Sequence, residues 1–61
     1  MDNYIKDVSY KIFELRDFAK RNGDIQSYEV YKKMLKQLER YSNSSFLLAK
    51  SAYYKQFYTT K

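Results

Sequence analysis

The chain has 61 residues, with 12 basic and 7 acidic side chains and a formal net charge of +5. It contains no cysteine and no histidine, which excludes a disulfide framework and a zinc site of the usual kind. A domain this small buries only about 60% of the surface of its unfolded chain. We therefore expect stabilisation by a partner, either as a homodimer or in a complex with another protein.

The sequence also limits the class of fold. It has no run of about 18 apolar residues, so we expect no membrane-spanning helix. The N-terminal stretch MDNYIKDVS lacks the basic and then apolar layout of a signal peptide, which favours a cytoplasmic location. Proline is absent and glycine occurs once, so little interrupts helices. We predict an all-α protein with a single helical domain over residues 1–61.

The first predicted helix spans about residues 3–21, and Asp2 or Asn3 can cap its N-terminus. Its apolar residues recur at three- and four-residue intervals and form one seam: Ile5, Val8, Ile12, Leu15 and Ala19. Tyr10 and Phe13 lie well away from this seam on a helical wheel. We expect them to form a second apolar face, apart from the seam. Either the third helix or a partner covers this face. Both are therefore candidate partner-binding residues.

A short turn, Asn22-Gly23-Asp24, separates the first helix from a second one over about residues 25–41. Gly23 can take the left-handed conformation that ends a helix, and Asp24 can cap the next one. A link this short makes the two helices an antiparallel hairpin. The second helix carries a broad apolar stripe: Tyr28, Tyr31, Leu35 and Leu38, widened by Met34 and Tyr41. We expect the first helix to account for this stripe.

The other side of the second helix is basic. Lys32, Lys33 and Lys36 lie there, and Lys50 and Lys55 add positive charge further along the chain. These five lysines are candidate anion-binding residues. The alternative explanation is a solvated helix face that has no ligand.

The stretch Ser42–Ser45 favours a break, because serine and asparagine side chains compete for backbone hydrogen bonds. We predict a third helix over about residues 44–58, with Asn43 or Ser44 as its N-cap. In the alternative, the second helix continues through this stretch and the protein has two long helices. The third helix is apolar over most of its circumference, which predicts burial on more than one side. Its aromatic residues are candidate partner-binding residues: Tyr53, Tyr54, Phe57 and Tyr58.

The sequence offers little for catalysis. It has no histidine base and no cysteine nucleophile, and one glycine cannot form a phosphate-binding loop. The carboxylates are spread along the helices near basic residues, as Asp17 is near Arg21, which is typical of solubilising pairs. We expect no enzyme, no cofactor and no small-molecule substrate. Eight tyrosines and four phenylalanines exceed the needs of so small a core, and they favour a protein-binding module that regulates or inhibits a larger partner.

An alternative function is nucleic-acid binding by the C-terminal third. Basic and aromatic residues alternate there and could contact phosphates and stack on bases: Lys50, Tyr53, Tyr54, Lys55, Tyr58 and Lys61. The segment has no arginine, the residue favoured for phosphate and base-edge contacts. The helix-only, Lys-, Tyr- and Asn-rich composition resembles that of small accessory proteins of low-GC bacteria and their phages. That resemblance implies a regulator or inhibitor that binds a larger host protein.

Overall fold

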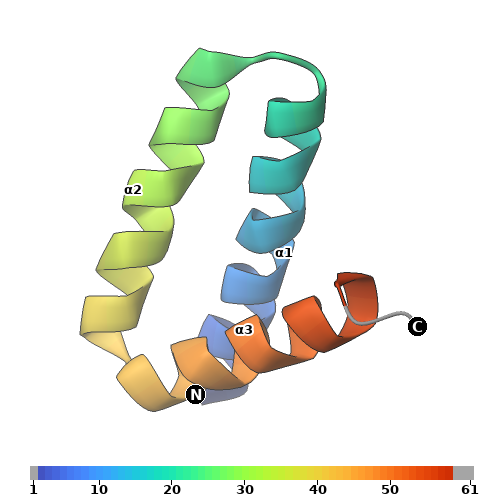
Figure 1. Ribbon diagram of the computed structural model, residues 1–61. Coiled ribbons are helices and arrows are strands. Elements are labelled where there is room, and N and C mark those ends of the chain that lie inside the picture. Colours follow the sequence, from blue (N-terminus) through green and yellow to red (C-terminus); the bar gives the residue numbers. More distant parts are fainter. Residues whose placement is uncertain (1, 59–61) are drawn as a thin grey trace.

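The computed structural model describes residues 2–58, which form three α-helices. These are α1 (Asp2–Arg21), α2 (Ile25–Tyr41) and α3 (Asn43–Phe57). The predicted all-α architecture of a helical hairpin completed by a third helix is confirmed, and each predicted boundary lies within about one residue of the observed one. Figure 1 shows α1 and α2 as an antiparallel pair, with α3 turning at the end of α2 to run across α1. None of these three helices is long and apolar enough to cross a membrane.

The first turn has the chemistry that the sequence predicts. Gly23 adopts a positive φ of 73°, and its N–H donates to the carbonyl of Lys20 at 3.1 Å. The N–H of Asp24 donates to the carbonyl of Ala19 at 2.9 Å, which completes a Schellman motif and pairs two carbonyls at the end of α1. The side chain of Asp24 accepts a hydrogen bond from the N–H of Ser27 at 3.2 Å and so caps α2.

The second joint is a break at one residue. Ser42 is extended, with φ −148° and ψ 88°, so the alternative of a continuous second helix is wrong. The prediction of Asn43 or Ser44 as the N-cap is also wrong, because both already lie in α3 and Ser42 holds the cap position. Its side chain makes no capping bond. The backbone carbonyl of Ser42 instead accepts from the N–H of Phe46 at 3.0 Å, which starts the helix.

The core lies where α3 crosses α1 beside α2. Its buried side chains come from all three helices: Ile12, Phe13, Leu35, Phe46 and Tyr53. Phe13 is 2% exposed, and its ring centroid lies 5.5 Å from that of Phe46 and 5.4 Å from that of Tyr53. Ser9 and Ala49 are fully buried small residues on the faces that α1 and α3 turn to the core. Small side chains at a crossing allow the helix axes to approach closely.

The helices form two layers. The Cα positions extend over 33 × 30 × 14 Å, and the shortest dimension matches two helices packed face to face. One layer is the α1–α2 hairpin and the other is α3, so one face of the hairpin has no helix on it (Figure 1). Met34 is 40% exposed and Tyr41 is 78% exposed. The expectation that the first helix covers the whole stripe of the second is therefore wrong at its edge.

We predict that Gly23→Ala lowers the free energy of unfolding by about 1 kcal/mol, because a Cβ disfavours positive φ. No atom lies within 4 Å of the position a Cβ would take, so the cost comes from the backbone and not from a clash. Urea unfolding followed by far-UV circular dichroism measures it. The matched variant is Gly23→Asn, which tolerates this conformation better and loses less. Equal losses in both variants would contradict the conformational explanation.

We also predict that Ser9→Ala raises the free energy of unfolding by about 1 kcal/mol. The Oγ of Ser9 is buried and has no hydrogen-bond partner among the described residues. A buried hydroxyl without a partner is destabilising by roughly 1–3 kcal/mol, and alanine removes it with little change in volume. The same unfolding measurement tests this, with exposed Ser44→Ala as the control and an expected change within about 0.5 kcal/mol. A loss of stability in Ser9→Ala would show that the hydroxyl has a partner.

Candidate functional site

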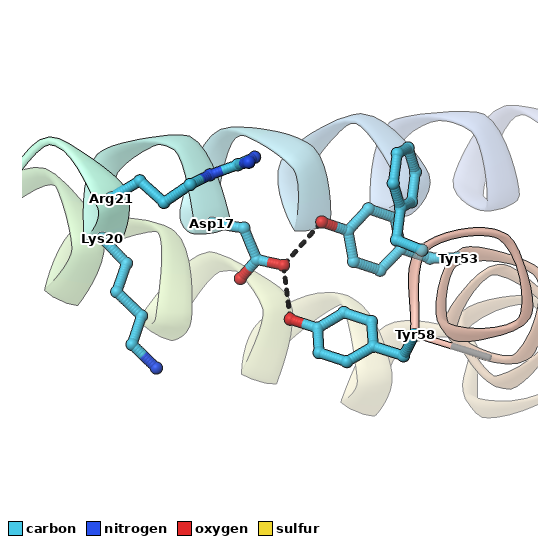
Figure 2. A pocket seen from close by; sticks show the side chains of 6 residues that line it. Asp17, Lys20, Arg21, Tyr53 and Tyr58 are labelled. Atoms are coloured by element: carbon cyan, nitrogen blue, oxygen red, sulfur yellow. Dashed lines mark hydrogen bonds between the residues drawn. The ribbon is translucent and has the colours of Figure 1, made fainter. Parts of the chain in front are cut away.

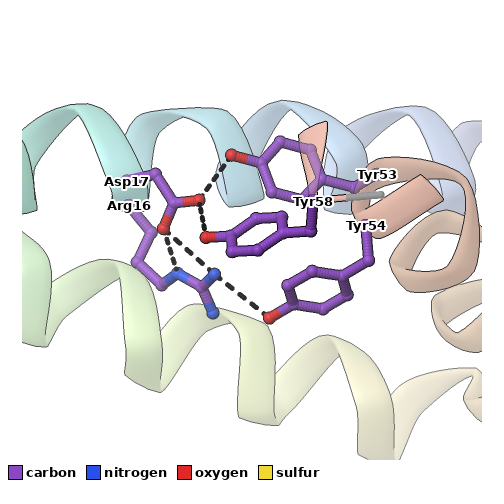
Figure 3. Close-up of polar contacts among 5 residues, drawn as sticks. All are labelled: Arg16, Asp17, Tyr53, Tyr54 and Tyr58. Atoms are coloured by element: carbon purple, nitrogen blue, oxygen red, sulfur yellow. Dashed lines mark hydrogen bonds and ion pairs between the residues drawn. The ribbon is translucent and has the colours of Figure 1, made fainter. Parts of the chain in front are cut away.

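Asp17 on α1 joins three tyrosines to α1, directly or through Arg16: Tyr53 and Tyr54 of α3, and Tyr58, which follows the last residue of α3. The hydroxyls of Tyr53 and Tyr58 both donate to Oδ2 of Asp17, at 2.5 Å and 2.8 Å (Figure 2). Nε and Nη2 of Arg16 lie 3.1 Å from the other carboxylate oxygen, Oδ1. Nη2 also donates to the hydroxyl of Tyr54 at 3.2 Å (Figure 3). Three of the four predicted contact aromatics of α3 therefore have their hydroxyls fixed against α1.

The electrostatics of this cluster favour the charged carboxylate. Burial alone would raise the pKa of Asp17, but the hydrogen bonds from Tyr53 and Tyr58 and the charge of Arg16 outweigh it and hold this pKa below its usual value. Burial, and then the bond to Asp17, raise the pKa of Tyr53. The bond to Asp17, and then burial, raise the pKa of Tyr58. At neutral pH each group is in the protonation state that its hydrogen bond needs.

The structure places the predicted partner-binding residues in two different settings. Phe13 and Tyr53 are core residues, and half-buried Tyr10 meets Tyr53 edge-on with ring centroids 5.6 Å apart. Of the two alternatives for the face of Tyr10 and Phe13, cover by the third helix is the one observed. Phe57 and Tyr58 remain about half exposed, and their contact with a partner stays a prediction.

An apolar groove lies between α1 and α2. It has a volume of about 370 Å³, and none of its lining residues comes from α3: Val8, Ile12, Met34, Gln37, Leu38 and Tyr41. From the sequence, Met34 and Tyr41 were expected to pack against the first helix, and the groove was not predicted. The available signal was the width of the stripe on α2, since these two residues, seven apart, lie at its edge. A single neighbouring helix covers only the middle of so broad a stripe.

Basic side chains flank the groove. On α2, Lys33 and Arg40 are both exposed. Lys33 lies four residues before Gln37, which lines the groove, and Arg40 lies three residues after it, so both are neighbours of Gln37 on the helix surface. Lys11 is exposed and lies three residues after Val8 on α1. Helical spacing therefore places exposed basic residues of both helices next to residues that line the groove.

The predicted anion-binding lysines do not form one strip. Lys32, Lys36 and Lys50 line a separate hollow of about 220 Å³ where α2 and α3 meet α1. Lys33 lies beside the groove, and Lys55 is exposed on α3. Lys61, which belongs to the nucleic-acid alternative, is outside the described residues.

A third hollow, of about 490 Å³, surrounds the Asp17 cluster. Lys20, Arg21 and Phe57 line it together with Asp17 and its tyrosine partners (Figure 2). The carboxylate of Asp17 lines this hollow together with the cations of Lys20 and Arg21. The chain therefore supplies a negative charge of its own here. The cluster is best explained as the polar contact that holds α3 on α1.

Comparisons of the chain with protein-family models, with curated proteins and with solved structures found no match. Within residues 2–58, no three acidic side chains gather closely enough to hold a metal ion. Two features of the described residues that can indicate a function are the apolar groove and the hollow lined by lysines.

We predict that Tyr53→Phe lowers the free energy of unfolding by about 1.5–3 kcal/mol, the usual contribution of a hydrogen bond to a charged group. Tyr58→Phe loses less, because Tyr58 is more than half exposed and water replaces its partner.

We also predict that stability depends on acid pH through Asp17. The stability linked to Asp17 is present above its unfolded pKa of about 3.9 and disappears as the pH falls through its lower folded pKa. Urea unfolding from neutral pH to below about 3 measures both effects.

The control for the acid dependence is Asp17→Asn, which has no carboxylate to titrate. Its stability at neutral pH falls, and the loss of stability below about pH 4 becomes shallower than in the unmodified chain. If stability fell as steeply at acid pH in this variant as in the unmodified chain, other carboxylates would be responsible for the loss.

Proposed function

We propose that this chain is a non-catalytic protein-binding module whose groove between α1 and α2 takes an amphipathic helix of a larger, acidic partner protein. The observation that carries the proposal is the apolar groove, where Met34 and Tyr41 stay exposed on the hairpin face that α3 leaves bare. Contiguous apolar surface of this kind is typical of interaction sites. Binding there would let the chain regulate or inhibit its partner without any chemistry of its own.

The dimensions suit a helix. The lining residues of α2 run from Met34 to Tyr41, which is two helical turns and about 10 Å. That length matches apolar anchors at positions i, i+3 or i+4, and i+7 of a docked helix. Tyr41 stands at one end of the groove, where its ring adds apolar area and its hydroxyl can bond to the partner.

The charge favours an acidic partner over a second copy of this chain. Lys33 and Arg40 border the groove on α2, Lys11 borders it on α1, and the whole chain carries a net charge of +5. In a two-fold dimer the groove would meet a copy of the same surface, so both sides of the interface would carry a basic border and would repel each other. Acidic residues flanking the apolar anchors of another protein would instead be attracted.

Nucleic-acid binding by α3 has less support. Tyr53 is 3% exposed, which leaves its ring faces closed to a base. Tyr54 is half-buried, and its ring packs edge-on against that of Tyr58 with centroids 4.7 Å apart. The stacking platform that the sequence suggested is thus mostly used within the chain.

We predict that Met34→Asp and Tyr41→Asp each weaken the binding of acidic amphipathic helical peptides by at least about tenfold. Each change places a charge on the groove floor, where an apolar anchor would have to desolvate it. The probes are peptides enriched from a library of such helices on the immobilised chain, and fluorescence anisotropy gives their dissociation constants. Both residues are exposed, so circular dichroism should show an intact fold.

The matched control is Leu48→Asp, which makes the same chemical change at an exposed position of α3, outside the lining of the groove. It leaves peptide binding unchanged. An equal loss in Leu48→Asp, or no enrichment of acidic helices over neutral ones, would contradict the proposal. Sedimentation equilibrium should give the monomer mass of 7.5 kDa. A particle of twice that mass that Met34→Asp dissociates would assign the groove to a second copy and refute a different partner.

A further inference from the structure

A second surface gathers cations from all three helices. Arg16 of α1, Lys32 and Lys36 of α2, and Lys50 of α3 line one hollow of about 220 Å³. Its lining has one acidic side chain, Glu39. The lining carries four positive groups and one negative group, and Asp17 pairs with Arg16 from outside the lining. A formal excess of two positive charges therefore remains around a space that can hold a small anion.

Two of these lysines have no ion-pair partner among residues 2–58. Lys36 and Lys50 form no ion pair with any described residue. Lys32 is half exposed, lies 3.9 Å from Glu29 and stands over the ring of Tyr28, a weak and solvent-screened pairing. The ammonium groups of Lys36 and Lys50 are therefore available to a ligand.

Arg16 is held in place beside them. Its Nε and Nη2 bond to Asp17 and Tyr54 (Figure 3), and its guanidinium carbon lies 5.2 Å from the ring centroid of Phe13. Nη1 takes part in none of these bonds, makes no other hydrogen bond within the described residues and is not buried. The guanidinium is thus oriented in advance, with two N–H donors still unused.

We propose that this hollow binds the phosphate group of a phosphate monoester. A dianionic phosphate presents three oxygens, which can accept from donors of all three helices, whereas a carboxylate has two oxygens and a single charge. The buried side chains of Phe13, Leu35 and Phe46 form the apolar part of the lining. They keep water from one side of the site and so strengthen its electrostatic contacts. The proposal does not depend on the apolar groove, which has none of these residues.

The experiment is a titration of the full chain with inorganic phosphate and with phenyl phosphate at constant ionic strength, followed by NMR chemical shifts. Saturable shifts should appear at the Arg16 side chain and around Lys36 and Lys50. Lys36→Gln and Lys50→Gln each weaken binding by roughly two- to fivefold, as for the loss of one exposed ion pair. Glu39→Gln strengthens it by a similar factor, because it removes the negative charge of the lining.

The matched control is Lys33→Gln, which removes the same charge from α2 at a position outside the hollow. It leaves phosphate binding unchanged, and so does Met34→Asp in the groove. Equal weakening by Lys33→Gln and Lys36→Gln would reduce the effect to general attraction by a basic chain and overturn the site. Acetate binding as tightly as phosphate would overturn the phosphate assignment. Tighter binding of single-stranded DNA, equally sensitive to Lys33 and Lys36, would replace the hollow with a diffuse nucleic-acid surface.

Discussion

The structure depends on how α3 sits on α1, with the ring of Phe13 packed against the rings of Phe46 and Tyr53. Burying one such aromatic side chain contributes roughly 1.5–3 kcal/mol, a large part of the stability of a chain this small. The hydroxyl of Tyr53 also donates a hydrogen bond to Asp17, which adds a polar contact between the same two helices. Because α3 must meet Phe13, it covers one face of the hairpin. The other face, which holds Met34, is then left open.

The sequence predicts the elements well and the covered face poorly. Gly23 and Asp24 mark the first turn through local backbone requirements that any packing must respect, and the Ser42–Ser45 stretch marks the second in the same way. The side on which α3 docks depends on contacts between residues more than 30 positions apart, and the periodicity within each helix carries no information about it. Phe13 was therefore taken for surplus surface, and Met34 was taken for core.

The candidate sites were predictable to the same partial extent. Asp17 looked like half of a solubilising pair with Arg21, and its tyrosine partners 36 and 41 residues away leave no local pattern in the sequence. The basic character of α2 was visible, but Lys36 and Lys50 converge only because the chain breaks at Ser42. Composition gives the number of lysines, and the angle between helices decides which of them share a hollow.

Both inferred binding surfaces lie along α2, which buries fewer side chains than α3 does. Leu35 is its one buried side chain in the described structure, whereas α3 buries four. The groove lies on the α1 side of α2, and the lysine hollow lies where α2 meets α3. A ligand at either place would add contacts between α2 and a neighbouring helix and would stabilise the folded state in proportion to its concentration relative to its dissociation constant. Met34 and Tyr41 of α2 are among the large apolar side chains that so short a chain leaves exposed, and a partner in the groove can supply their burial.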